Sequence, residues 1–167
     1  MRIEPLTAQH DVSQFDCGEE SLNSYIKFAL QARQMNLAST FVCVEDESNV
    51  VSGYYTRVMN SISAESIGKP GGVKRPVPVM LLAQFAVASN AQRQGIGKKL
   101  LRHFFERVIQ LTEEGEACFG VILDALNQPA KEYYLEYGFK ECSDNPSRLY
   151  LPLKLVKKAA RGKLGPA

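Results

Sequence analysis

The segment Gln92–Lys99 combines glycines and basic residues in a pattern that suits an anion. It reads Gln-Arg-Gln-Gly-Ile-Gly-Lys-Lys, so Gly95 and Gly97 stand one residue apart. Two such glycines let the backbone approach a ligand closely and turn its N–H groups outward. The segment lies between a strand-like apolar stretch and a helix-like amphipathic one. A helix start adds partial positive charge and unbonded N–H groups to such a loop.

The charges at this junction run against the usual preference at a helix start. Arg93, Lys98 and Lys99 stand there without an acidic neighbour. Each cation in a first turn opposes the helix dipole by roughly 0.3–1 kcal/mol when unscreened. A bound phosphate or diphosphate would reverse that cost. We therefore predict an anion site, with a helix entry carrying solvated basic side chains as the alternative.

Two common phosphate motifs do not match this loop. A Walker loop requires Ser or Thr after Gly-Lys, and Lys99 stands there instead. The dinucleotide fingerprint requires a third glycine, and Leu100 occupies its place.

A second group of residues lies downstream, at the end of another apolar stretch. Ala130 and Tyr134 are four residues apart, so they share one face of a helix, and Asn127 precedes them. The small Ala130 leaves room for a thin ligand to pass the helix. A tyrosine hydroxyl can give its proton to a leaving group such as a thiolate. Packing in the core beside Tyr133 and Tyr137 is the alternative role for Tyr134.

The elements that must position these two groups follow from periodicity and from turn residues. The apolar stripe from Ile96 to Ile109 has 3.6-residue spacing and predicts an amphipathic helix docked on a sheet. Pro152 suggests that the last strand lies at a sheet edge. The order of elements predicts a mixed α/β domain around one central sheet. We expect helices over 21–30, 96–110 and 127–138, strands over 40–45, 50–60, 79–87, 121–126 and 148–153, and a loop at 68–72.

Length and composition are those of one ordinary globular domain. The chain has 167 residues, of which 45% are hydrophobic and 23% charged, which excludes fibrous, disordered and repeat classes. We expect one domain over 1–155 and a basic, flexible tail over 156–167. No signal-peptide core and no membrane-length apolar run is found, which indicates a cytoplasmic protein. The net charge of +2 is too small to indicate nucleic-acid binding by itself, and the location of the charges matters more than their sum.

The cysteines and histidines do not form a metal motif. The four cysteines are far apart, and we expect free thiols and no zinc site. They are Cys17, Cys43, Cys118 and Cys142.

Together, the two groups resemble the motifs of the GNAT superfamily of N-acetyltransferases. The acetyl-CoA loop of that family has Gln or Arg, then Gly, then Gly or Ala, at the spacing of Gln92, Gly95 and Gly97. Its later motif matches the second group from Asn127 to Phe139. The resemblance implies a single GNAT-like α/β (α+β mixed) domain, with a central, mostly antiparallel, splayed sheet flanked by helices.

The resemblance also implies a role for each matched residue, with acetyl-CoA as the cosubstrate. Tyr134 would be the catalytic residue that protonates the departing CoA thiolate. Asn127 and Ala130 would lie beside the pantetheine arm. Backbone atoms of the strand before the loop would bind that arm, and these residues are Phe85, Ala86 and Val87. The diphosphate would be held by Gln92, Arg93, Gln94, Gly95, Ile96, Gly97 and Lys98.

The flanking segments resemble a narrower branch, the GNAT toxins of toxin–antitoxin modules. They include Phe15-Asp16-Cys17-Gly18 followed by Leu22-Asn23, and Leu149–Lys154. This branch acetylates the α-amino group of aminoacyl-tRNA, halts translation and pairs with a ribbon-helix-helix antitoxin that binds DNA. One departure concerns the strand before the loop, where Gln84 replaces the branch's usual arginine and so removes a fixed cation near the expected acceptor end.

The choice of acceptor also rests on the bases that the sequence offers. An α-amine with a pKa near ~7.7–8 is partly neutral at physiological pH, whereas a lysine amine near ~10.4 needs a strong base. Gln84 and Gln94 cannot titrate, His10 is remote, and we expect His103 to be solvated on the polar face of its helix. This favours an α-amine acceptor and catalysis mainly by positioning.

Two alternatives stay open. The acceptor could be a small amine or a protein N-terminus, or the chain could chiefly bind a DNA-binding antitoxin. Six basic residues and no acid follow position 147, which suits a phosphate backbone or, equally, a solvated tail. We expect no membrane partner, and a homodimer is one of the open oligomeric states.

Overall fold

The computed structural model describes residues 1–166, which contain seven strands and four α-helices. The strands are β1 (Arg2–Pro5), β2 (Ser39–Val44), β3 (Val51–Ile62), β4 (Val77–Val87), β5 (Gly120–Asp124), β6 (Lys140–Cys142) and β7 (Asn145–Pro152). The helices are α1 (Glu20–Gln34), α2 (Ile96–Glu113), α3 (Gln128–Glu136) and α4 (Leu153–Ala160). Short 3-10 turns lie at η1 (Glu65–Ile67), η2 (Pro70–Gly72) and η3 (Ser89–Ala91).

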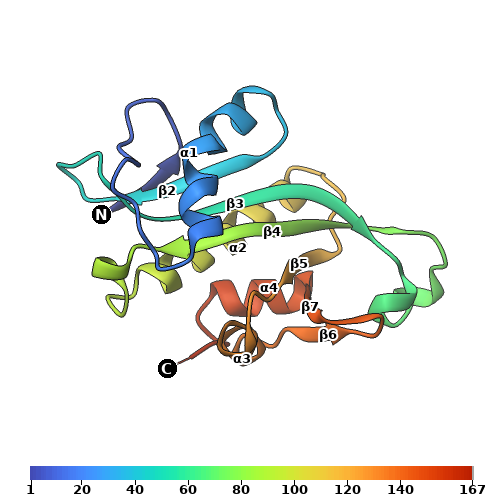
Figure 1. Ribbon diagram of the computed structural model, residues 1–167. Coiled ribbons are helices and arrows are strands. Elements are labelled where there is room, and N and C mark those ends of the chain that lie inside the picture. Colours follow the sequence, from blue (N-terminus) through green and yellow to red (C-terminus); the bar gives the residue numbers. More distant parts are fainter. Residues whose placement is uncertain (167) are drawn as a thin grey trace. The chain divides into compact units, whose positions relative to one another are not determined.

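The strands form one mostly antiparallel sheet in the order β1-β2-β3-β4-β5-β7-β6 (Figure 1). Pairing is antiparallel for β1–β2, β2–β3, β5–β7 and β6–β7, and parallel for β4–β5. A sheet of this kind with helices in the connections confirms the predicted mixed α/β class.

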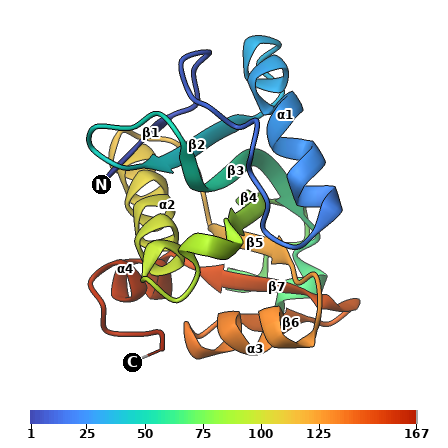
Figure 2. The ribbon, with the colours of Figure 1, turned by 60° about the vertical axis from the view of Figure 1, so that its left-hand side comes forward.

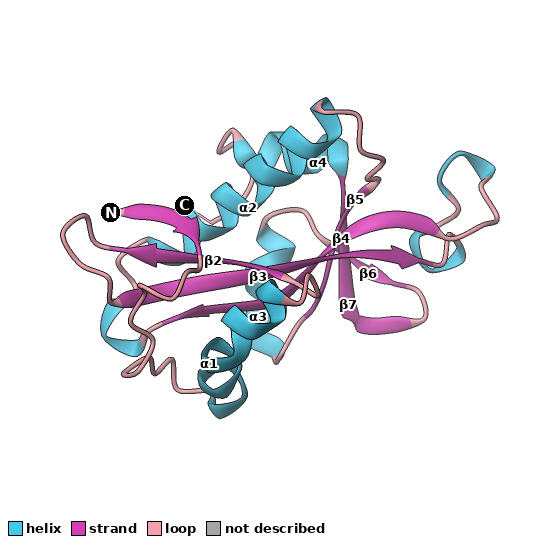
Figure 3. Cartoon of the chain, turned by 90° about the horizontal axis from the view of Figure 1, so that it is seen from above, coloured by secondary structure: helices cyan, strands magenta, loops and turns pink. Residues whose placement is uncertain are grey.

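The first of two compact units comprises Met1–Val58 and Ala83–Phe104. Within it, α1 and the first half of α2 lie on opposite faces of β2 and β3 (Figures 2 and 3). Helix α1 buries Ile26 and Ala29. Helix α2 comes very near β3, because a Cβ placed on Gly53 would lie 2.9 Å from a methyl group of Leu100.

The second unit comprises Met59–Leu82 and the chain from Phe105 onward. Its strands β5, β7 and β6 are neighbours, and both α3 and α4 contact β7. A buried cluster joins the end of β3, the start of β4 and the middle of β5 through Ile62, Val79 and Ile122. The cluster packs against the middle of β5 and so holds in place the strand that leads to Asn127.

Most predicted elements are confirmed, with ends shifted by a few residues. The structure adds two short strands that the sequence analysis missed, β1 and β6, of four and three residues. Segments this short carry too few residues for an alternation pattern to be recognised.

The predicted edge position of the last strand is wrong. Strand β7 lies between β5 and β6. Pro152 ends β7 opposite Gly120, whereas the pairing with β6 begins only at Tyr150. The missing proline N–H therefore falls beyond the reach of β6, and an interior strand tolerates it.

The basic C-terminal segment also differs from expectation. The flexible tail expected over 156–167 begins inside α4, which continues to Ala160 and buries Val156, Ala159 and Ala160. These apolar residues share one helix face at spacings of three and four, while Lys154 is exposed. Lysines interrupt this short stripe, so its helical spacing is difficult to recognise in the sequence.

Two further features concern environment. Within the described residues, no helix is long and apolar enough to cross a bilayer. All four cysteines are free thiols, as predicted; Cys43 and Cys142 are buried, while Cys17 and Cys118 are half-buried.

Candidate active site

The loop between β4 and α2 makes its turn with two left-handed residues. After Gln92, which is extended, Arg93 has φ +62° and Gly95 has φ +79°, and α2 begins at Ile96. A non-glycine residue in this region costs roughly 1–2 kcal/mol. Nothing lies within 4 Å of a Cβ placed on Gly95, so its φ alone explains the glycine. The loop therefore holds a strained conformation on the surface at a helix start.

The first turn of α2 has the electrostatics that the sequence predicts. It contains no acidic residue, and Arg93, Lys98 and Lys99 are exposed around it. The first i to i−4 bond of the helix runs from Lys99 N to Gly95 O, at 3.1 Å. Amide groups before that bond lie at the positive end of the helix dipole, where anions bind.

Gly97 lies in this first turn, against the end of β4. A Cβ there would lie 3.7 Å from the side chains of Phe85 and Val87, an ordinary contact. Alanine therefore fits, and a larger side chain would extend over the end of β4. The limit on size agrees with the Gly-or-Ala position of the predicted motif.

The side chains of the two loop glutamines donate hydrogen bonds to backbone carbonyl groups in and around the loop. Gln92 Nε2 donates to Val87 O at 3.1 Å and to Cys17 O at 3.4 Å. Gln94 Nε2 donates to Asn90 O at 3.0 Å. These amides fix the course of the backbone, so the loop would meet a ligand mainly through its N–H groups and basic side chains.

The end of β4 offers the backbone expected to bind a pantetheine arm. The register with β5 runs from Met80 to Leu82, and β4 continues to Val87. Ala86 is buried, while Phe85, Val87 and Gln84 are half-buried.

Helix α3 shows how the second group is built. Asn127 is its N-cap, with Oδ1 accepting a hydrogen bond from Ala130 N at 2.9 Å. The turn after the helix contains Gly138 at φ +88°, at the end of the helix expected over 127–138. The predicted cofactor residue Asn127 thus has a structural role that the sequence analysis missed, although Asn three residues before Ala130 carries the signal of a cap.

Tyr134 is a packed residue of this helix, with 7% of its surface exposed. Its ring meets Tyr133 and Phe139 edge-on, at centroid distances of 5.4 and 5.7 Å. Burial, with a smaller contribution from Tyr137, raises the pKa of Tyr134 well above its ordinary value. The hydroxyl therefore keeps its proton at neutral pH, the form in which it can donate a proton or a hydrogen bond.

The two histidines have partners other than solvent. His10 Nε2 lies 2.9 Å from a Glu4 carboxylate oxygen. The solvated position expected for His103 is wrong, because its ring is half-buried and packs on Phe41, and its Nδ1 lies 2.9 Å from the Tyr55 hydroxyl. Tyr55 lies 48 positions away in the sequence, so no local pattern reveals this contact.

Arg148 also differs from expectation. It forms a bidentate pair with Asp124, at 2.8 and 2.9 Å, which removes it from the basic residues available to a phosphate backbone. Among the residues described, no group of three or more His, Cys, Asp or Glu side chains could hold a metal ion.

Comparisons with known proteins agree with the fold described above. The model of the acetyltransferase (GNAT) domain matches residues 37–141. A tRNA-acetylating toxin of Mycobacterium tuberculosis is 32% identical over 160 residues, covering 93% of this chain and 91% of the toxin. The structure of AtaT complexed with acetyl-methionyl-tRNAfMet has a TM-score of 0.84 and 25% identity, covering 93% of this chain and 96% of that one. A Tyr-to-Phe mutant of AtaT, bound to acetyl-CoA and the C-terminus of the antitoxin AtaR, has a TM-score of 0.81 and 26% identity, covering 93% and 95%. The chain therefore belongs to the GNAT family of acetyltransferases.

Proposed function

We propose that this acetyltransferase moves the acetyl group of acetyl-CoA to the α-amino group of aminoacyl-tRNA and thereby blocks translation. The observation that carries the proposal is the basic, acid-free start of α2 behind a left-handed glycine, which suits a diphosphate. The similarity to a tRNA-acetylating toxin and to AtaT with acetyl-methionyl-tRNAfMet supports the acceptor.

The loop Gln92–Lys98 would hold the diphosphate of acetyl-CoA. Its N–H groups and the exposed Arg93 and Lys98 offer donors and positive charge to phosphate oxygens. Backbone atoms of Phe85, Ala86 and Val87 would bind the pantetheine arm as an added strand. Asn127 and Ala130 would lie beside that arm. Asn127 would also hold the start of α3 in place through its hydrogen bond with Ala130 N.

Tyr134 would act as the general acid. The neutral amine attacks the thioester carbon, a C–N bond forms and the C–S bond breaks. Tyr134 gives its proton to the departing sulfur, and the proton lost by the amine returns to the tyrosine oxygen through water. The products are the acetylated amine and CoA thiol, so atoms and charge balance.

The contacts of the two histidines favour an α-amine as acceptor. His10 and His103 are both engaged within the first unit, and Gln84 on β4 cannot titrate. An α-amine with a pKa near ~7.7–8 is already partly neutral at pH 7, whereas a lysine amine is not. Holding the two reactants in place then supplies most of the rate.

Helix α4 adds positive charge suited to a phosphate backbone. It exposes Lys154 and Lys158, and Arg161 directly follows it, while its apolar face is buried. Binding to tRNA should therefore weaken as salt rises.

A ribbon-helix-helix antitoxin is the partner we propose, in line with the AtaT structure bound to the C-terminus of its antitoxin. We also propose a cytoplasmic location, because translation uses aminoacyl-tRNA there.

The test is transfer of labelled acetyl groups to tRNA. Purified chain is incubated with radiolabelled acetyl-CoA and either charged or deacylated tRNA. We expect label only on charged tRNA, released when the aminoacyl ester is hydrolysed, and little label with Tyr134→Phe. Absence of label on every charged tRNA of a total pool would refute the proposed acceptor.

A further inference from the structure

The short turn Phe15–Gly18, which precedes α1, contacts the loop between β4 and α2. We propose that this α1-entry turn positions the diphosphate loop, and that Asp16 and Asn23 are positioning residues for acetyl-CoA binding. The inference rests on the proposed role of the loop and assigns a task to a motif that the chemistry leaves unused.

Side-chain hydrogen bonds hold the α1-entry turn in one shape. One carboxylate oxygen of Asp16, Oδ1, accepts from Gly18 N at 2.9 Å and from Asn23 Nδ2 at 2.8 Å. The other end of the Asn23 amide, Oδ1, accepts from Cys17 N at 2.8 Å. The turn requires Gly18, which has φ +87°. Asp16 and Asn23 thus close a ring of three bonds around the turn.

This ring orients two carbonyl groups toward the loop. The carbonyl of Asp16 accepts from Ser89 N at 2.8 Å, directly after β4. The carbonyl of Cys17 accepts from Gln92 Nε2, which also bonds Val87 O. The turn therefore contacts both the beginning and the middle of the junction that leads to Gly95.

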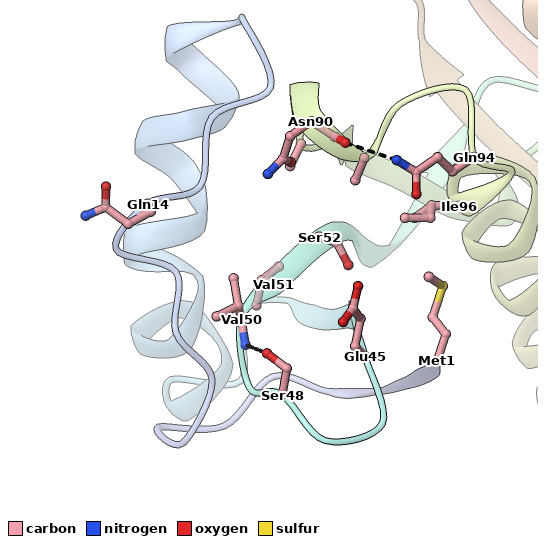
Figure 4. A pocket seen from close by; sticks show the side chains of 12 residues that line it. Met1, Gln14, Glu45, Ser48, Val50, Val51, Ser52, Asn90, Gln94 and Ile96 are labelled. Carbon is pink, nitrogen blue, oxygen red and sulfur yellow. Dashed lines mark hydrogen bonds between the residues drawn. The ribbon is translucent and has the colours of Figure 1, made fainter.

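One side of the loop borders a pocket. A cavity of about 320 Å³ is lined by Asn90, Ala91 and Gln94 of the loop, with Ser52 and Glu45 among its other lining residues (Figure 4). On the side of this pocket the loop lacks the close contacts that locate core residues, although Ala91 and Ile96 are themselves buried.

The left-handed conformation of Arg93 requires support from residues around the loop. A left-handed non-glycine residue persists only where its surroundings over-determine the backbone. The bonds from the α1-entry turn supply that constraint from one side of the loop. Without them the loop can relax, and its N–H groups would no longer all face one diphosphate.

The expected consequence is a defect in binding and not in chemistry. Asp16→Ala removes the acceptor of two bonds and should raise the KM for acetyl-CoA about tenfold, the scale of one or two lost hydrogen bonds. The kcat at saturating acetyl-CoA should stay within about twofold, because Asp16 touches no reacting atom. Asp16→Asn keeps the Oδ1 acceptor and should restore most of the affinity.

The control is Asp11→Ala. Asp11 is also exposed and also holds a local turn, in which its Oδ1 accepts a hydrogen bond from Ser13 N at 2.9 Å. It should lose a similar small amount of stability and leave the KM for acetyl-CoA unchanged.

The experiment compares coenzyme A binding by calorimetry, and both kinetic constants, for the wild type, Asp16→Ala, Asp16→Asn, Asn23→Ala and Asp11→Ala. A selective rise in Kd and KM for Asp16→Ala and Asn23→Ala, with recovery in Asp16→Asn, supports the inference. Should Asp16→Ala fail to fold, Asn23→Ala gives the same reading.

Unchanged affinity in both alanine variants, or an equal loss in Asp11→Ala, would overturn the inference and leave the proposed function standing. A wild-type chain that does not bind coenzyme A would instead overturn the proposed loop function on which the inference depends.

Discussion

Replacing Gly95 by alanine separates the role of the loop in binding from its role in folding. Gly95 has φ +79° and Gly115, just after the other end of α2, has φ +103°. Neither glycine has an atom within 4 Å of an added Cβ, so alanine meets conformational strain but no clash at either place. The two substitutions are therefore matched in their expected cost to the fold.

The strain of a left-handed alanine is roughly 1–2 kcal/mol at each position. For a chain of this length, 1 kcal/mol lowers the Tm by about 2–4 °C. Both variants should therefore melt a few degrees below the wild type. Only Gly95→Ala should lose coenzyme A affinity, by at least about tenfold or ~1.4 kcal/mol, because relaxation of Gly95 turns the N–H groups at the start of α2.

Thermal melting and calorimetric titration with coenzyme A measure the two effects. If Gly95→Ala bound coenzyme A as tightly as Gly115→Ala, the account of the loop as a diphosphate site would be wrong.

Three further predictions concern the second unit. Tyr134→Phe should lower kcat by about 100-fold or more, the usual contribution of a general acid, while the Kd for coenzyme A stays within about twofold. Steady-state kinetics and calorimetry measure the two constants, and an unchanged kcat would remove Tyr134 from the mechanism. Asn127→Ala should lower the free energy of unfolding by about 1 kcal/mol, and Asn127→Ser should lower it much less, because serine also caps helices. Equal free energies of unfolding for the two variants in urea titrations would contradict this prediction. Burial raises the pKa of Cys142 to about 11, so the folded chain keeps a proton that the unfolded chain loses. Stability should fall as pH rises from about 8.5 toward 11, and less steeply in Cys142→Ala; equal slopes in denaturant titrations would exclude Cys142 as a source.

Local patterns in the sequence predict the elements that carry the site. The stripe from Ile96 to Ile109 and the glycine at position 138 depend on neighbours within a few residues, so helix α2 and the turn after α3 could be predicted. Gly95 also follows a local rule, because a left-handed backbone conformation favours glycine whatever lies around it.

Contacts between distant residues could not be predicted in this way. Gln92 and Cys17 are 75 positions apart, and Tyr55 and His103 are 48 apart. Neither pair has a pattern that a single sequence reveals. The place of β7 inside the sheet likewise depends on β6, a three-residue strand too short to recognise.

The most direct test of the central claim compares coenzyme A with pantetheine, which carries the thiol arm but lacks the diphosphate and the phosphoadenosine attached to it. Calorimetric titration of the folded chain should show binding of coenzyme A and at least about 100-fold weaker binding of pantetheine, since charge-assisted bonds to the diphosphate supply most of the difference. Equal affinity for the two compounds, or no uptake of coenzyme A, would contradict a diphosphate site at the start of α2.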